Sequence, residues 1–176
     1  INLELSIDHG FRDIAAEGYD AGVRLGESVD KDMVAVRIAA DGRLVAVATP
    51  GYFAQNPAPR TPKDLTAHRC INLRMVTSGG LYAWEFQKGG ENLRVRVTGQ
   101  VTFNSINGCL QAVLDGFGIG FLPEGAVRAH LTAGNLQLVL DDWSQPIPGL
   151  HLYYPSRRHI SPAFRIIIDA LRLKGS

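Results

Sequence analysis

The sequence predicts an α/β fold, because strand and helix patterns alternate along the chain in three places. Residues 3–7 alternate apolar and polar side chains, and a helical stripe and a second apolar strand follow up to residue 25. Residues 101–122 show the same order of strand, helix and strand. An alternating strand at residues 150–154 comes before a final helix at residues 161–171. Strand–helix–strand units build parallel sheets, whose ligands gather at the carboxyl ends of the strands.

The composition is typical of a soluble globular protein. The chain of 176 residues is long enough for one sizeable domain or two small lobes. Its net charge of +1 argues against a nucleic-acid-binding surface, and no apolar run reaches the roughly 20 residues that cross a bilayer. Cys70 and Cys109 lack metal-ligand spacing, so we expect buried thiols in a reducing, cytoplasmic compartment.

The first strand–helix–strand unit contains two candidate binding residues. Asp8 directly follows the strand at residues 3–7, and Arg24 lies near the end of the strand at residues 19–25. We therefore expect both side chains to face a cleft at the carboxyl ends of these strands. Two alternatives stay open: Asp8 could cap the helix at residues 11–18, and Arg24 could form a surface salt bridge.

The middle of the chain reads as strands separated by proline-rich and glycine-rich segments. Pro50-Gly51 interrupts the second of two apolar strands, and residues 53–62 hold three prolines, which predicts irregular structure. Thr61-Pro62 is typical of a short helix start. The predicted strands are residues 33–38, 44–49 and 70–73, followed by a hairpin over residues 82–97 that turns at Gly89-Gly90. The aromatic row of the hairpin could line a pocket, although packing is its commoner use.

Residues 101–125 form the segment with the clearest binding potential. Asn104 and Ser105 are good N-cap residues, and they stand between a strand and a helix with an apolar stripe. A polar corner at a helix N-terminus can bind a small anion, and Asn107 lies in the same first turn. The alternative is that Asn104 and Ser105 only cap the helix. The spaced glycines at 116–120 follow a helix and precede a strand, which is the reverse of a dinucleotide-binding fingerprint.

The last third of the chain continues the alternation. Residues 124–131 read as a helix, residues 136–140 and 150–154 as strands, and Ser161-Pro162 as the start of the final helix. The five histidines are scattered, and the sequence has no P-loop, HExxH or G-x-S-x-G motif. We expect no metal and no cofactor, and a binding module fits these residues better than an enzyme, although scattered polar residues can converge in space.

Several stretches together resemble one protein family. In this order along essentially the whole chain, they are similar to the effector-binding region of LysR-type transcriptional regulators: EGYDAGVRLGES, VAVATPGYF, TPKDLTAHRCINLR, LYAWEF, LQAVLDGFGIGFLPE and LHLYYPSRRHISPAFRIIIDALR. LYAWEF and HLYYPSRR are similar to the branch related to regulators of small organic acid metabolism and stress responses.

The resemblance implies a two-lobed, periplasmic-binding-protein-like (type II) fold. Lobe I would hold residues 1–49 and 153–176, and lobe II residues 50–152. The chain opens inside a strand pattern, without an initiator Met or a secretory signal. Against the family pattern we therefore expect a first lobe truncated at its N-terminus, without the family's first strand and helix. The winged helix-turn-helix that binds DNA would also lie outside this chain.

The resemblance also implies a function. A small, anionic organic effector would bind in the interlobe cleft, contacted by Asp8, Arg24, Asn104, Ser105 and Asn107. The region would associate as a homodimer or tetramer, would reach DNA only through the N-terminal domain, and would contact no membrane. The alternative functions are a periplasmic-type solute-binding protein and an enzyme with a convergent site.

Overall fold

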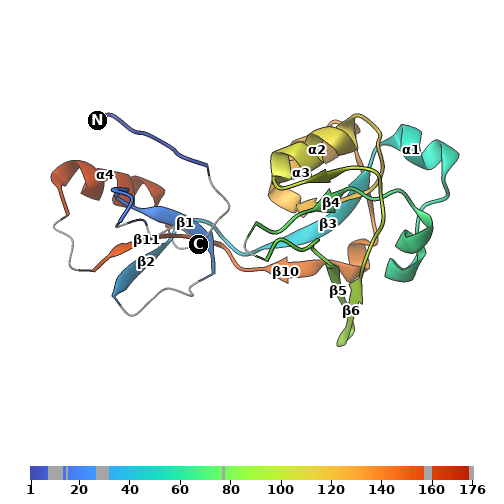
Figure 1. The fold of residues 1–176 in the computed structure, drawn as a ribbon, viewed down its shortest axis with the longest axis horizontal. Coiled ribbons are helices and arrows are strands. Elements are labelled where there is room, and N and C mark those ends of the chain that lie inside the picture. Colours follow the sequence, from blue (N-terminus) through green and yellow to red (C-terminus); the bar gives the residue numbers. More distant parts are fainter. Residues whose placement is uncertain (8–13, 15, 27–31, 77, 157–159, 175–176) are drawn as a thin grey trace. The chain divides into compact units, whose positions relative to one another are not determined.

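A computed structural model describes the chain except for residues 8–13, 15, 27–31, 77, 157–159 and 175–176. The described chain divides into two compact units (Figure 1). The first contains residues 1–42 and 147–176, and the second contains residues 43–146. The lobes that the family resemblance implies, residues 1–49 with 153–176 and residues 50–152, stay a prediction.

The first unit is built on a three-stranded antiparallel sheet. Its central strand β11 (Leu150–Pro155) pairs with β1 (Gly22–Leu25) on one side and with β2 (Met33–Arg37) on the other. The helix α4 (Pro162–Leu171) covers one face of the sheet (Figure 1). The core between them consists of Val36, Leu152, Tyr154, Phe164 and Ile168.

The start of α4 confirms the cap-then-proline prediction. The Ser161 hydroxyl accepts a hydrogen bond from the Phe164 amide at 3.2 Å, and Pro162 occupies the first helical turn, where a missing N–H costs nothing. Phe164 packs edge-on against Tyr154, with ring centroids 5.3 Å apart. This contact joins the helix to the central strand.

The predicted parallel strand–helix–strand unit at the start of the chain is wrong for the described residues. Residues 1–7 form no strand, and their apolar side chains are 64–84% exposed. β1 pairs antiparallel with β11 instead of parallel with residues 3–7. An alternating pattern forms a strand only where another strand accepts its backbone hydrogen bonds, and no described residue pairs with this segment. Half of the predicted helix at residues 11–18, namely residues 11–13 and 15, lies outside the described residues.

The second unit is built around the long strand β3 (Gly42–Ala48). β3 pairs antiparallel with β8 (Gly120–Pro123) and β9 (Gln137–Val139), and it also lies next to β10 (Gln145–Ile147). A short parallel pair is formed by β4 (Asn72–Leu73) and β7 (Thr102–Phe103).

The aromatic hairpin is confirmed. It consists of β5 (Trp84–Lys88) and β6 (Glu91–Val95), paired antiparallel. Gly89 and Gly90 both have positive φ angles, 57° and 85°, as a two-residue hairpin turn that matches the strand twist requires.

The helices of the second unit are α1 (Pro50–Gln55), α2 (Ile106–Leu114), α3 (Glu124–Thr132) and the 3₁₀ helices η1 (Pro62–Ala67) and η2 (Asp141–Trp143). The sequence prediction missed α1. Pro50 does not break this helix but begins it, because Thr49 caps the first turn with its hydroxyl, 3.2 Å from the Tyr52 amide. The predicted short helix after Thr61 is confirmed as η1, where the Asp64 carboxylate accepts the Thr61 amide at 2.8 Å.

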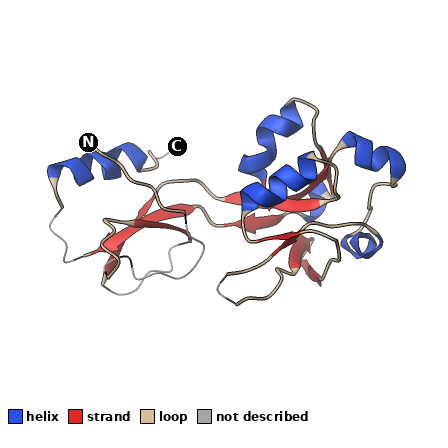
Figure 2. Ribbon diagram, turned by 45° about the horizontal axis from the view of Figure 1, so that its top comes forward, coloured by secondary structure: helices blue, strands red, loops and turns tan. Residues whose placement is uncertain are grey.

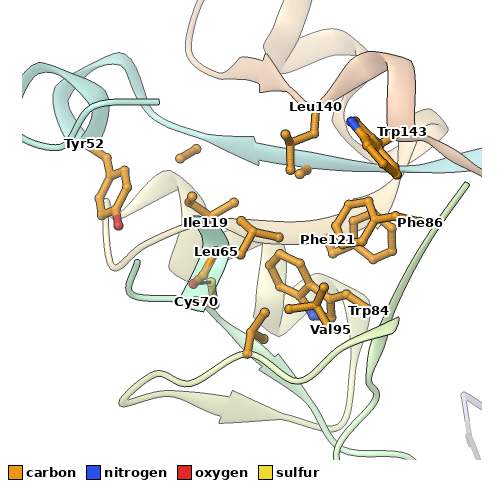
Figure 3. Packing of buried hydrophobic residues seen from close by; sticks show 13 residues of the cluster. Tyr52, Leu65, Cys70, Trp84, Phe86, Val95, Ile119, Phe121, Leu140 and Trp143 are labelled. Carbon is orange, nitrogen blue, oxygen red and sulfur yellow. Dashed lines mark hydrogen bonds between the residues drawn. The ribbon is translucent and has the colours of Figure 1, made fainter. Parts of the chain in front are cut away.

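β3 lies between two hydrophobic cores. One face packs with the hairpin, where Trp84 stacks on Phe121 at 5.2 Å and Phe86 contacts the same ring (Figure 3). The opposite face packs under α2 and α3 (Figure 2). Trp84 and Phe86 are almost fully buried, so these two members of the aromatic row serve packing and do not line a pocket.

Candidate functional site

The polar corner predicted at Asn104-Ser105 is a capped helix start within the second unit. β7 ends at Phe103, and the extended backbone of Ser105 leads into α2. The Ser105 hydroxyl accepts the Gly108 amide at 3.2 Å, so Ser105 is an N-cap residue. A Cβ at Gly108 would approach the Phe103 ring to 2.7 Å, which explains why glycine stands in this tightly packed first turn.

The α2 N-terminus keeps its positive character. Its first turn contains no acidic side chain. Ile106 and Asn107 lie in the first turn of α2, where the main-chain N–H groups have no acceptor within the helix. Together with the helix dipole, such amides favour a bound anion.

The main chain of Arg74 lies beside this corner. The parallel pairing of β4 with β7 brings their carboxyl ends together, and the Arg74 amide donates to the Phe103 carbonyl at 2.7 Å. The guanidinium donates to the Gly79 carbonyl at 2.7 Å, which fixes one end of an exposed side chain. We define Arg74, Asn104, Ser105 and Asn107 as the Ser105 corner.

The sequence reasoning missed Arg74. A usable signal was present, because Arg74 directly follows β4 and Asn104 directly follows β7, the strand that pairs with β4. Reading that signal requires knowing that β4 and β7 are neighbours, and 28 residues with a hairpin separate Leu73 from Thr102.

A buried amide in β4 also has unused hydrogen-bonding capacity. Asn72 is 3% exposed, and its Oδ1 has no hydrogen-bond partner among the described residues. An unsatisfied buried acceptor costs about 1–3 kcal/mol. A ligand that donates a hydrogen bond to Oδ1 of Asn72 would therefore bind favourably. Asn72 lies opposite Thr102 in the β4–β7 register, next to the strand end that carries Arg74.

The remaining predicted residues belong to the first unit. Arg24 lies on β1 with its guanidinium 5.0 Å from the centre of the Tyr153 ring. Gly22 makes room for that ring, because a Cβ there would collide with the Tyr153 side chain. Asp8 lies outside the described residues. The grouping of Asp8 and Arg24 with the Ser105 corner around one ligand stays a prediction.

The described part of the chain offers little for metal or thiol chemistry. No group of three or more metal-ligating side chains gathers among the described residues. Burial raises the pKa of the Cys70 thiol to about 12 and that of Cys109 to about 11, so both stay protonated at neutral pH. None of the described helices is both long and apolar enough to cross a membrane.

Comparison with known proteins shows which family this chain resembles. Residues 1–175 match the family model of the LysR substrate-binding domain. The chain is 51% identical to a putative transcriptional regulator of Pseudomonas aeruginosa, over 98% of this chain and 56% of that protein. It is 42% identical to the HTH-type transcriptional regulator PgrR of Escherichia coli, over 100% of this chain and 59% of PgrR. The chain thus spans little more than half the length of these relatives.

Solved structures show the same fold. The full-length structure of the virulence activator AphB of Vibrio cholerae matches with a TM-score of 0.82 at 24% identity, over 97% of this chain and 57% of AphB. CrgA of Neisseria meningitidis matches with a TM-score of 0.79 at 22% identity, over 90% of this chain and 53% of CrgA. The predicted periplasmic-binding-protein-like α/β fold is thereby confirmed, and this chain belongs to the LysR substrate-binding domain family, the effector-binding region of LysR-type transcriptional regulators.

Proposed function

We propose that this chain senses a small organic anion for a cytoplasmic LysR-type regulator and catalyses no reaction. The observation that carries the proposal is the Ser105 corner, where a capped helix start without acidic residues stands beside Arg74. The two curated relatives described above are named as transcriptional regulators, which supports this function over a periplasmic solute-binding protein.

A carboxylate at the α2 N-terminus would gain from several contacts. The first-turn amides and the helix dipole each favour negative charge, and a charge-assisted hydrogen bond contributes about 1.5–3 kcal/mol. Arg74 would pair with the carboxylate, while Asn104 and Asn107 would orient the rest of the ligand. Arg24 would contribute a second cation from the first unit, and Asp8 would favour an effector that also carries a hydroxyl or amine.

Effector binding would then shift the population of conformations in the whole regulator. The name of PgrR includes a helix-turn-helix, and we propose a DNA-binding domain of that kind outside these residues as the route to DNA. This chain itself has a net charge of +1 and would show no specific operator binding.

The first test is a search for the effector with matched variants. A library of small mono- and dicarboxylates is screened by thermal shift, and the strongest ligand is titrated by calorimetry into wild type, Arg74→Gln and Ser105→Ala. Each substitution is expected to weaken binding about tenfold or more, because each removes a contact to a charged group. Ser105→Ala also lowers stability by about 1 kcal/mol through the lost cap.

Ser161→Ala is the control, because it removes the cap of α4 in the same way but lies in the first unit. It should lower stability about as much as Ser105→Ala and leave affinity unchanged. The proposal fails if Asn104→Ala, Ser105→Ala, Arg74→Gln and Arg24→Ala all bind the ligand as wild type does. In that case Asn104 and Ser105 serve only as caps.

A further inference from the structure

A hollow of about 380 Å³ lies within the second unit, at the other end of α2 from Ser105. Asp115 and Gly116, which follow the last turn of α2, form one side of it, and Thr49 and Tyr52 of the α1 start form another. A nine-residue helix is about 13 Å long, so this hollow is separate from the Ser105 corner. Its volume lies within the usual range for small-molecule sites.

The aromatic side of the hollow is held in a fixed position. Tyr52 is 4% exposed, and its hydroxyl accepts the Arg69 amide at 3.2 Å. The same hydroxyl lies 3.1 Å from Nδ1 of His68. Because burial lowers the pKa of His68, this ring is neutral near pH 7 and its Nδ1 can accept the tyrosine proton. Two hydrogen bonds therefore fix the tyrosine ring before any ligand arrives.

Arg69 brings a positive charge to the hollow. Its guanidinium lies 5.5 Å from the centre of the Tyr52 ring and is exposed. None of the ion pairs among the described residues involves it. Its main chain is fixed, because its carbonyl accepts the Ile119 amide at 2.9 Å, and a Cβ at Gly118 would collide with that carbonyl. The guanidinium can thus pair with a ligand carboxylate.

Asp115 brings a negative charge to the same hollow. It is the C-cap residue of α2, where the helix dipole disfavours an acidic side chain. The only side-chain hydrogen bond to its carboxylate from the described residues is a long one, 3.3 Å from Nε2 of Gln111. Asp115 and Arg69 line one hollow, yet they form no ion pair with each other within 4.0 Å.

We propose that this hollow binds a free α-amino acid. A simple anion would be repelled by Asp115, and a simple cation by Arg69, whereas a zwitterion satisfies both. The ligand carboxylate would pair with Arg69 and its ammonium group with Asp115. Leu114 and the Tyr52 ring would contact the ligand side chain. Thr49 accepts the Tyr52 amide through its hydroxyl oxygen, so the hydroxyl proton remains for the ligand.

The experiment is calorimetry on this chain with the standard amino acids. The strongest binder is then compared with two analogues, the amine that lacks its carboxylate and the carboxylic acid that lacks its amino group. Binding is expected for the amino acid, with about tenfold or greater loss for each analogue. Arg69→Gln and Asp115→Asn should each cause a similar loss. Arg60→Gln and Asp169→Asn, which change exposed residues that do not line the hollow, should bind as wild type does.

Three results would overturn the proposal: no standard amino acid binds at tens of millimolar, both single-charge analogues bind as well as the amino acid, or Arg69→Gln and Asp115→Asn bind unchanged. Melting curves of each variant show whether it is folded, and Asp115→Asn should melt no lower than wild type because it removes an unfavourable helix charge. Ser105→Ala must still bind the amino acid. Binding lost in Ser105→Ala but kept in Arg69→Gln would place the ligand at the Ser105 corner instead, so this proposal and the proposed effector site can fail separately.

Discussion

Tyr52, His68 and Arg69 show how single residues connect local structure to a binding surface. Tyr52 belongs to α1, whereas His68 and Arg69 follow η1, and the tyrosine hydroxyl bonds to both. The hydroxyl accepts from a main-chain amide that cannot change its role, so it must donate to His68. That donation is possible only while the Nδ1 atom of His68 carries no proton.

The first residue-scale prediction is a loss of stability on mild acidification. Burial depresses the pKa of His68 below its usual value of 6.5 in the folded state, so the unfolded chain binds this proton more readily. The contribution of neutral His68 to the stability of the fold is fully present above about pH 6.5. It is lost as the pH falls from there through the pKa of His68 in the folded state. We expect the melting temperature of wild type to fall between about pH 7 and pH 5 more than that of His68→Gln.

The acidic side chains with shifted pKa values do not interfere with this experiment. The pKa values of the Asp41, Asp64 and Glu124 carboxyl groups lie below their ordinary values of 3.8–4.5, so these groups destabilise the fold only at lower pH. Coincident profiles for wild type and His68→Gln would show that the Tyr52–His68 hydrogen bond is not coupled to folding.

At the scale of elements, one arginine ties three segments of the second unit together. Arg43 at the start of β3 donates to Asp141 of η2 at 2.6 Å and to Glu124 of α3 at 2.9 Å. It also reaches the Ser144 hydroxyl at 3.3 Å, directly before β10. The side-chain hydrogen bond from Arg43 is the main cause that lowers the pKa of Glu124. Strand, helix and loop are therefore joined by one side chain.

The element-scale prediction is that Arg43→Met lowers stability at neutral pH. Methionine keeps the apolar stem of the arginine, so the substitution removes the ion pairs alone. Because the Arg43 side chain is 34% exposed, the free energy of unfolding should fall by about 0.5–1 kcal/mol. The difference from wild type should shrink as pH falls through the folded pKa of Glu124, because protonation of Glu124 then removes the pair from wild type as well.

Arg128→Met is the matched control, since Arg128 lies 3.7 Å from the same Glu124 but is 73% exposed. Its effect in denaturant titrations should be smaller than that of Arg43→Met. Equal effects of the two substitutions would contradict the special role of Arg43.

At the scale of the whole molecule, the first unit presents an apolar sheet edge. Val23 and Leu25 on β1 are 49% and 56% exposed, and Leu150, which pairs with Leu25, is 38% exposed. β1 pairs only with β11 among the described strands, so no described strand covers its other edge. Apolar surface combined with a free strand edge favours association.

We therefore predict that the chain forms a dimer or a larger species. Light scattering at high micromolar concentration should give at least twice the monomer mass of 19.1 kDa. Leu25→Lys should shift the protein toward monomer, because it places charge on the exposed strand. Leu81→Lys, an exposed leucine in the second unit, serves as the control. A monomeric wild type would contradict the prediction.

The sequence by itself determined the local features of this protein. Ser105 and Ser161 cap their helices, Gly89-Gly90 turns the hairpin, and the apolar strand after Asp41-Gly42 forms the centre of the second unit. Each of these depends on residues a few positions apart, because caps, turns and strand periodicity are short-range effects.

Only the tertiary structure decided the pairings. The alternating residues 3–7 form no strand, β1 pairs with the distant β11, and Pro50 begins a helix where the prolines predicted irregular structure. Arg74 comes beside Phe103 because β4 pairs with β7, and Arg69 shares a hollow with Asp115, 46 positions further along the chain. Periodicity specifies which face of a strand is apolar but not which strand lies next to it. Both candidate sites consist of residues that such long-range pairings bring together.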